Sequence, residues 1–240
     1  MSLCILTAVH FISNVQQLIK KSNELIRNYM KTFLNVYSLN MLFILFSFIL
    51  IITYLQQEYI VIPHLSNMPM VDETLKAKIF EGYYKHRWLM YLIPLAILLI
   101  RVSLVGMCLF LGSFFIERQQ EIKYADGWNV ALKSDIILIL SSVMVCTIAV
   151  MFGAEQAEVV GRYCSLAFLV DPNITEQWLL VPIAALNIFE VVYWFFMAKL
   201  VAVQSGSGYW SSFKFVLSTY GVGYLFYIVF LMFLLLYLTN

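Results

Sequence analysis

The chain has 240 residues, of which 62% are hydrophobic, 16% aromatic and only 12% charged, and its formal net charge is +1. This composition lies outside the range of soluble globular domains. We therefore expect an all-α integral membrane protein in contact with the lipid bilayer, with no nucleic-acid partner.

Residues 1–31 predict an amphipathic helix ahead of the first membrane span. Apolar residues such as Phe11, Val15 and Leu18 recur at helical spacing, while basic residues such as Lys20 fall on the other side. One interpretation is a helix that lies on the cytoplasmic leaflet. The other is that the apolar stripe packs on the bundle or on another chain.

Residues 32–240 predict one transmembrane domain with five helices. A helix rises ~1.5 Å per residue and the hydrocarbon core is ~30 Å thick, so a crossing needs roughly 20 mostly apolar residues. In the third of the five stretches, the uninterrupted apolar part begins only at Ile136, and the flank "NVALKSD" predicts a helical lead-in at the interface. The predicted spans are 33–55, 89–116, 131–152, 178–203 and 213–238.

The distribution of Lys and Arg predicts the orientation of the chain. The segment before the first span and the loops after the second and fourth spans carry more of these residues than the other two loops. Because positive residues concentrate in cytoplasmic segments, we expect the N-terminus in the cytoplasm and the C-terminus outside.

Two loops and one helix face carry further structural signals. In the loop 56–87, the stretch "VDETLKAKIFEGYYKHR" predicts a short interfacial helix. The half-apolar segment 159–170 is too short to span a membrane, so we expect it to pack against the mouth of the bundle. Thr219 and Gly223 are small residues at four-residue spacing, which favours close helix packing within the chain or between chains.

No pattern of catalytic or metal-binding residues is present. Glu158 and Arg162 have the E-x-x-x-R spacing of intramembrane CAAX-type proteases, but His10, His64 and His86 all lie outside the predicted spans, so the required histidine ligands are missing. The same histidines do not fit a zinc site, and the four cysteines form no C-x-x-C pair. The segment "QSGSGYW" lacks the lysine of a phosphate loop and predicts a turn. We expect no metal, no cofactor and no enzymatic activity.

Two charged residues lie inside the predicted spans. Arg101 is near the middle of the second span and Glu190 near the middle of the fourth, so their depths match. An unpaired charge at mid-bilayer costs ~2.5 to 3.5 kcal/mol on insertion scales, and such residues usually face inward and pair. We therefore predict an Arg101–Glu190 ion pair, with Asn187, one turn from Glu190, sharing the hydrogen bonds of its carboxylate. The pair is structural, or it also lines a polar pathway for ions, substrate or protons, or Glu190 is unpaired and functional.

The closing pattern "ALNIFEVVYWFFMAKLVAVQSGSGYWSSFKFVLSTYGVGYLF" resembles the bacterial branch of the Yip-domain (Ypt-interacting-protein) family. The resemblance covers about residues 184–226, and the five-span topology agrees with it. It implies a non-enzymatic helical protein that works through partners in the membrane, here the inner (plasma) membrane of a bacterium.

These observations predict an accessory or scaffold protein of a membrane complex, with other membrane subunits or further copies of itself as partners. The alternative is a small permease or permease subunit whose pathway uses Arg101, Glu190 and Asn187. A membrane enzyme ranks third, because no group of carboxylates or histidines gathers at one interface.

Overall fold

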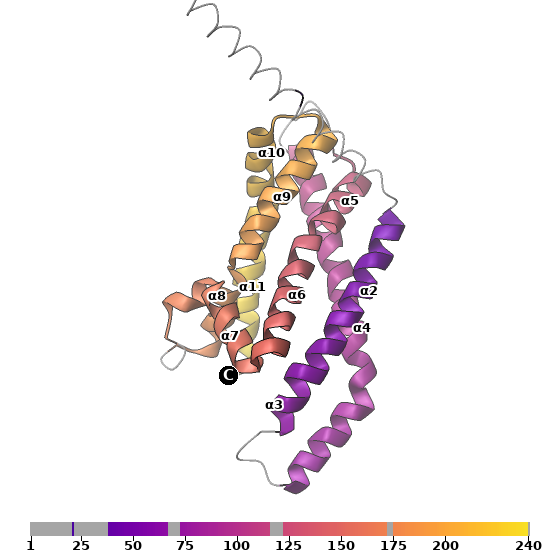
Figure 1. The fold of residues 1–240 in the computed structure, drawn as a ribbon. Helices are drawn as coiled ribbons and strands as arrows, with labels where there is room; N and C mark the ends of the chain where they lie inside the picture. Colours follow the sequence, from indigo (N-terminus) through magenta and orange to yellow (C-terminus); the bar gives the residue numbers. More distant parts are fainter. Residues whose placement is uncertain (1–20, 22–37, 67–72, 116–121, 172–174, 240) are drawn as a thin grey trace, which may run out of the picture.

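The computed structural model describes residues 21, 38–66, 73–115, 122–171 and 175–239. These residues form helices and no strand, as predicted (Figure 1). The helices long and apolar enough to cross a membrane are Leu39–Val61, Thr74–Phe115, Tyr124–Phe152, Ile188–Ser205 and Tyr209–Leu238. The chain is thus a five-span integral membrane protein. The amphipathic helix predicted over 1–31 lies outside the described residues, and the orientation of the chain stays a prediction.

The first span is part of one continuous helix that has three segments. It runs through α2 (Ser38–Gln56), a turn of π-helix named η1 (Gln57–Val61) and α3 (Ile62–Ser66). The π turn places Gln57 in the interior of the bundle, where it is buried.

The second span belongs to the longest helix, α4 (Glu73–Phe115). Its 43 residues correspond to about 65 Å at ~1.5 Å per residue, roughly twice the ~30 Å hydrocarbon core. The short interfacial helix predicted before this span is therefore not separate but is the beginning of α4. Its residues are mostly good helix formers, so the helix continues into the span. Figure 1 shows this end of α4 extending, with α3, beyond the other helices.

The third span bends at Asp135, which separates α5 (Tyr124–Ser134) from α6 (Ile136–Phe152). The apolar helix begins at Ile136, as the sequence indicates. Lys133, Ser134 and Asp135 in this lead-in are all buried inside the bundle, and their place at the membrane interface stays a prediction. The cause of their burial is close packing: Gly127 in α5 lies against Gly106 in α4, where a Cβ on Gly127 would be 2.8 Å from the Gly106 carbonyl oxygen.

The fourth span is discontinuous. After α7 (Ala154–Tyr163) and a short 3-10 helix, η2 (Leu166–Leu169), it consists of α8 (Gln177–Ala185) and α9 (Ile188–Ser205). The continuous helix predicted over 178–203 was wrong, because Asn187 caps a new helix in the middle of the apolar run. The segment 159–170 lies in α7 and η2, of which η2 packs against α8 and α7 packs against α6.

The fifth span returns directly from the fourth. A turn at Gly206, which has a left-handed backbone with φ of 65°, ends α9 and agrees with the turn predicted from the sequence. The chain then runs without a break through α10 (Tyr209–Val216), the π turn η3 (Leu217–Gly221) and α11 (Val222–Thr239).

Helix α9 is the centre of the bundle. Half of its residues are buried, compared with a sixth to a quarter in the most apolar windows of the other spans. It packs against α5, α6 and α10. The other membrane-spanning helices therefore expose most of their apolar side chains to lipid.

Small residues bring α4 against the fifth span, as the spacing of Thr219 and Gly223 predicts. A Cβ on Gly112 would lie 1.9 Å from Thr219 Cγ2, and one on Gly223 would lie 2.9 Å from Cys108 Sγ. This close packing occurs within one chain.

Substitution Gly112→Ala should lower the thermal stability of the purified protein by about 1–3 kcal/mol, because the added methyl group overlaps Thr219. Gly82→Ala in the same helix is the matched control, since nothing lies within 4 Å of its Cβ, and it should be neutral or stabilising. Thermal unfolding in detergent measures both. Equal stability of the two variants would show that α4 and the fifth span are not in this contact.

Candidate intramembrane polar site

The predicted contact between Arg101 and Glu190 is present. Arg101 on α4 approaches Glu190 in the first turn of α9, with 3.1 Å between Arg101 Nη2 and Glu190 Oε2. The Glu190 side chain is almost fully buried, whereas that of Arg101 remains 32% exposed. The two charges therefore meet inside the bundle, and Arg101 also reaches an open space.

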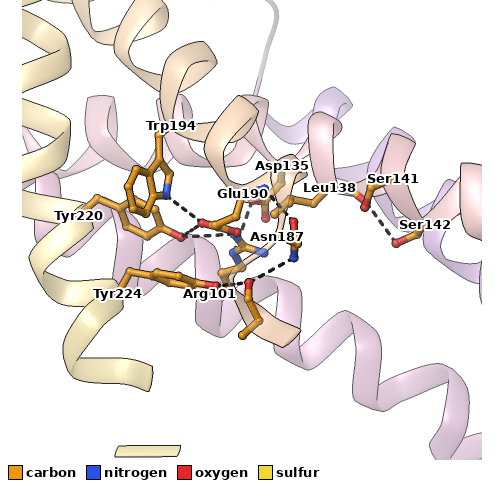
Figure 2. A network of polar contacts seen from close by, with 11 residues as sticks. Arg101, Asp135, Leu138, Ser141, Ser142, Asn187, Glu190, Trp194, Tyr220 and Tyr224 are labelled. Carbon is orange, nitrogen blue, oxygen red and sulfur yellow. Dashed lines mark hydrogen bonds and ion pairs between the residues drawn. The ribbon is translucent and has the colours of Figure 1, made fainter. Parts of the chain in front are cut away.

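Three donors from three segments satisfy the Glu190 carboxylate (Figure 2). Besides Arg101, the Tyr220 hydroxyl of η3 donates to Oε1 over 2.6 Å, and the indole Nε1 of Trp194 donates to the same atom over 3.1 Å. Tyr220 also accepts from Arg101 Nη2 at 3.3 Å, so it bridges the two charges. Such charge-assisted bonds are the strong kind, and they hold Glu190 in one position.

Asn187 is part of the site, but not in the predicted role. It does not contact the Glu190 carboxylate. Its Oδ1 accepts from the backbone N–H of Glu190 at 2.9 Å and its Nδ2 donates to the Ala185 carbonyl at 3.2 Å. Asn187 is the N-cap of α9, a position that asparagine favours because its side chain satisfies an otherwise free backbone donor.

Side chains and a neighbouring segment satisfy several backbone groups at the break in the fourth span. The Ala185 carbonyl also accepts from the Tyr224 hydroxyl at 2.7 Å. The chain after α7 forms a bridge with the break, in which Leu166 N–H donates to Leu186 and Ile188 N–H donates to Cys164, each over 2.9 Å. Irregular backbone at membrane depth is tolerated only where protein satisfies it in this way.

A second carboxylate, Asp135, lies beside Arg101 and was missed by the sequence analysis. It is 2% exposed, and its Oδ1 is 3.8 Å from Arg101 Nε, which is too far for a hydrogen bond. That oxygen is buried and has no hydrogen-bond partner among the described residues, although Asp135 is the N-cap of α6. The feature of the sequence that could have identified Asp135 is its position directly before the apolar run that begins at Ile136.

Tyrosine rings complete the surroundings of Arg101. The guanidinium carbon lies 4.9 Å from the centre of the Tyr193 ring, a cation–π contact that is strongest where water is excluded. Tyr193 packs edge-on against Tyr220. The site thus contains one guanidinium from α4, two carboxylates from the third span and α9, and aromatic groups from α9 and the fifth span.

A cavity of about 240 Å³ opens on one side of this cluster, between α2, α4 and α6. Arg101 and Asp135 line it, whereas Glu190 does not. Its other polar lining residues are Thr53, Gln56 and Ser142, and its remaining walls are apolar. The arrangement can accept a small polar or charged solute next to Asp135.

The other residues that the sequence analysis considered have structural contacts. Arg162 donates to the carbonyls of Ala167 and Val170, which shapes the loop before α8, and Glu158 is exposed. No group of three His, Cys, Asp or Glu residues gathers to hold a metal within the described part of the chain. Cys108, Cys146 and Cys164 are free thiols.

Comparisons with known proteins found no matching family model, no matching curated protein and no matching solved structure. The resemblance to the Yip-domain family therefore stays a prediction, as do the accessory role and the bacterial inner membrane. The site must be interpreted from its own geometry.

Exchanging the charges, with Arg101→Glu and Glu190→Arg together, should not restore wild-type stability. The new glutamate would face Asp135, and the new arginine would face the indole donor of Trp194. Fluorescence-detected size-exclusion chromatography of membrane extracts measures the folded fraction, with Arg101→Lys as the milder control that keeps the positive charge. If the exchanged variant accumulates as wild type does, the ion pair is independent of the neighbouring Asp135 and Trp194 side chains.

Replacing Asn187 by alanine should cost about 1 kcal/mol of stability, because the Glu190 backbone N–H loses its acceptor. Asn187→Ser should keep most of the wild-type stability, since a serine hydroxyl can also cap the helix. The two variants are compared by thermal unfolding in the same detergent. If they are equally stable, the side chain of Asn187 does not hold the break.

Proposed function

We propose that this protein is a membrane transport component, a small permease or permease subunit, whose pathway passes the site of Arg101, Glu190 and Asp135. The observation that carries the proposal is the cavity between α2, α4 and α6, which Arg101 and Asp135 line at the point where the third span bends. Polar cavities at discontinuous membrane helices are typical of solute sites in transporters.

Three spans depart from regular α-helix geometry around Arg101. The third span turns at Asp135, the fourth breaks before Glu190, and the fifth contains the π turn with Tyr220. Broken helices and π turns occur often at functional sites, because regular helices would be more stable. A bundle that needed only a neutral interior would not require these departures, which supports a site that binds and releases a solute.

The accessory role predicted from the sequence is the competing proposal. It needs partners, and the lipid-facing surfaces of α2, α4, α6 and the fifth span leave room for them. No feature of the polar cavity is needed for that role. The cavity therefore favours transport.

Proteoliposomes containing the purified protein test the proposal. Under a potassium gradient with valinomycin, trapped pyranine and a trapped sodium indicator should report proton or sodium flux above that of empty vesicles. Glu190→Gln should reduce this flux at least ten-fold, because the Arg101 contact that fixes α9 is weakened. Glu81→Gln, an exposed carboxylate on α4, is the control and should leave the flux unchanged.

Vesicles that remain as tight as empty ones to both probes would contradict transport of small ions. The accessory proposal would then be favoured, and co-purification of a defined membrane subunit with the native protein would support it.

A further inference from the structure

The charges of the polar site do not balance. Two carboxylates, Glu190 and Asp135, lie against one guanidinium, Arg101. Arg101 makes its short contact, 3.1 Å, with Glu190, while its contact with Asp135 is longer, 3.8 Å. If both carboxylates are ionised, the excess negative charge therefore resides on Asp135.

Asp135 is not stabilised in the way that buried carboxylates usually are. Its Oδ1 has no hydrogen bond within the described residues, and as N-cap of α6 its side chain accepts none of the free N–H groups. A buried carboxylate oxygen without a hydrogen bond is costly, so it normally has a close partner. The structure supplies a space for one, because Asp135 lines the cavity.

The cavity offers the ligands that a small cation needs. Thr53 and Gln56 on α2 and Ser142 on α6, which line the cavity together with Asp135, all carry side-chain oxygens. One carboxylate with neutral oxygens suits a monovalent cation, since a divalent ion would call for more negative ligands. In transporters, irregular segments at mid-membrane hold sodium ions and protons with groups of this kind.

We propose that Asp135 binds a monovalent cation, a proton or an alkali-metal ion, from the cavity between α2, α4 and α6. This inference rests on the proposed function for its biological meaning, but the binding itself can be measured without transport. Arg101 is then a positioning residue, which Glu190 and Tyr220 hold in place beside Asp135 through its Nη2 atom.

Thermal unfolding of the full-length protein in nanodiscs tests the binding. A ligand that binds only the folded state raises the unfolding temperature as its concentration increases. Sodium chloride and potassium chloride are titrated against choline chloride at constant ionic strength, and the pH is varied separately in choline chloride. An alkali-ion site predicts a rise with sodium or potassium, and a proton site predicts a dependence on pH with no difference between the salts.

Asp135→Asn should abolish the response that wild type shows, whereas Glu81→Gln should keep it. For the pH arm, the groups that face Asp135 and can titrate are Arg101, Glu190 and Tyr193. Glu190→Gln is therefore measured beside Asp135→Asn, and it should shift the dependence on pH without abolishing it, because Asp135 is still present. If Asp135→Asn does not fold, Ser142→Leu serves instead. The leucine side chain fills the cavity, and the substitution removes no bond to Asp135, because the Ser142 hydroxyl donates only to the Leu138 carbonyl.

The inference is overturned if Asp135→Asn or Ser142→Leu responds to the salts and to pH as wild type does, or if wild type responds to none of them. Its failure is distinguishable from that of the proposed function. Cation binding without flux in proteoliposomes removes transport alone, and flux that persists in Asp135→Asn removes the Asp135 site alone.

Discussion

The fold of this protein depends on placing one guanidinium in a membrane interior. An unpaired Arg101 would cost several kcal/mol there, so the bundle must bring negative groups to it. Glu190 on α9 and Asp135 at the start of α6 supply them, and the Tyr220 hydroxyl shares the positive charge. These contacts connect the second span to the third, fourth and fifth.

The broken fourth span is a consequence of the same requirement. A continuous helix would present Glu190 with its backbone N–H already bonded inside the helix, whereas the break makes Glu190 a first-turn residue near the positive end of α9. The cost of interrupting the helix is offset by Asn187, Tyr224 and the bridge from the segment after α7. The loop before α8 is thus part of the site's support, although it contributes no charge.

The features that depend on composition and on position along a span could be predicted from the sequence. The features that depend on contacts between distant segments could not. Five spans and the Arg101–Glu190 contact follow from apolar length and matching positions along it. The break at Asn187 does not, because an asparagine within an apolar run signals a cap only when another segment bonds the freed backbone. The burial of Asp135 inside the bundle does not follow either, because it depends on the close approach of Gly106 and Gly127, which are far apart in the sequence.

A structural ion pair accounts for Arg101 and Glu190 but not for Asp135. Glu190 alone neutralises the guanidinium, and its two oxygens are occupied by Arg101, Trp194 and Tyr220. A second carboxylate adds a desolvation cost and, with no hydrogen bond on Oδ1, regains little of it. Stability by itself would favour an asparagine or an apolar residue at this position. An acidic group that borders a cavity is instead explained by a positive occupant that enters and leaves, and this is the physical reason to assign the site to binding and not to folding alone.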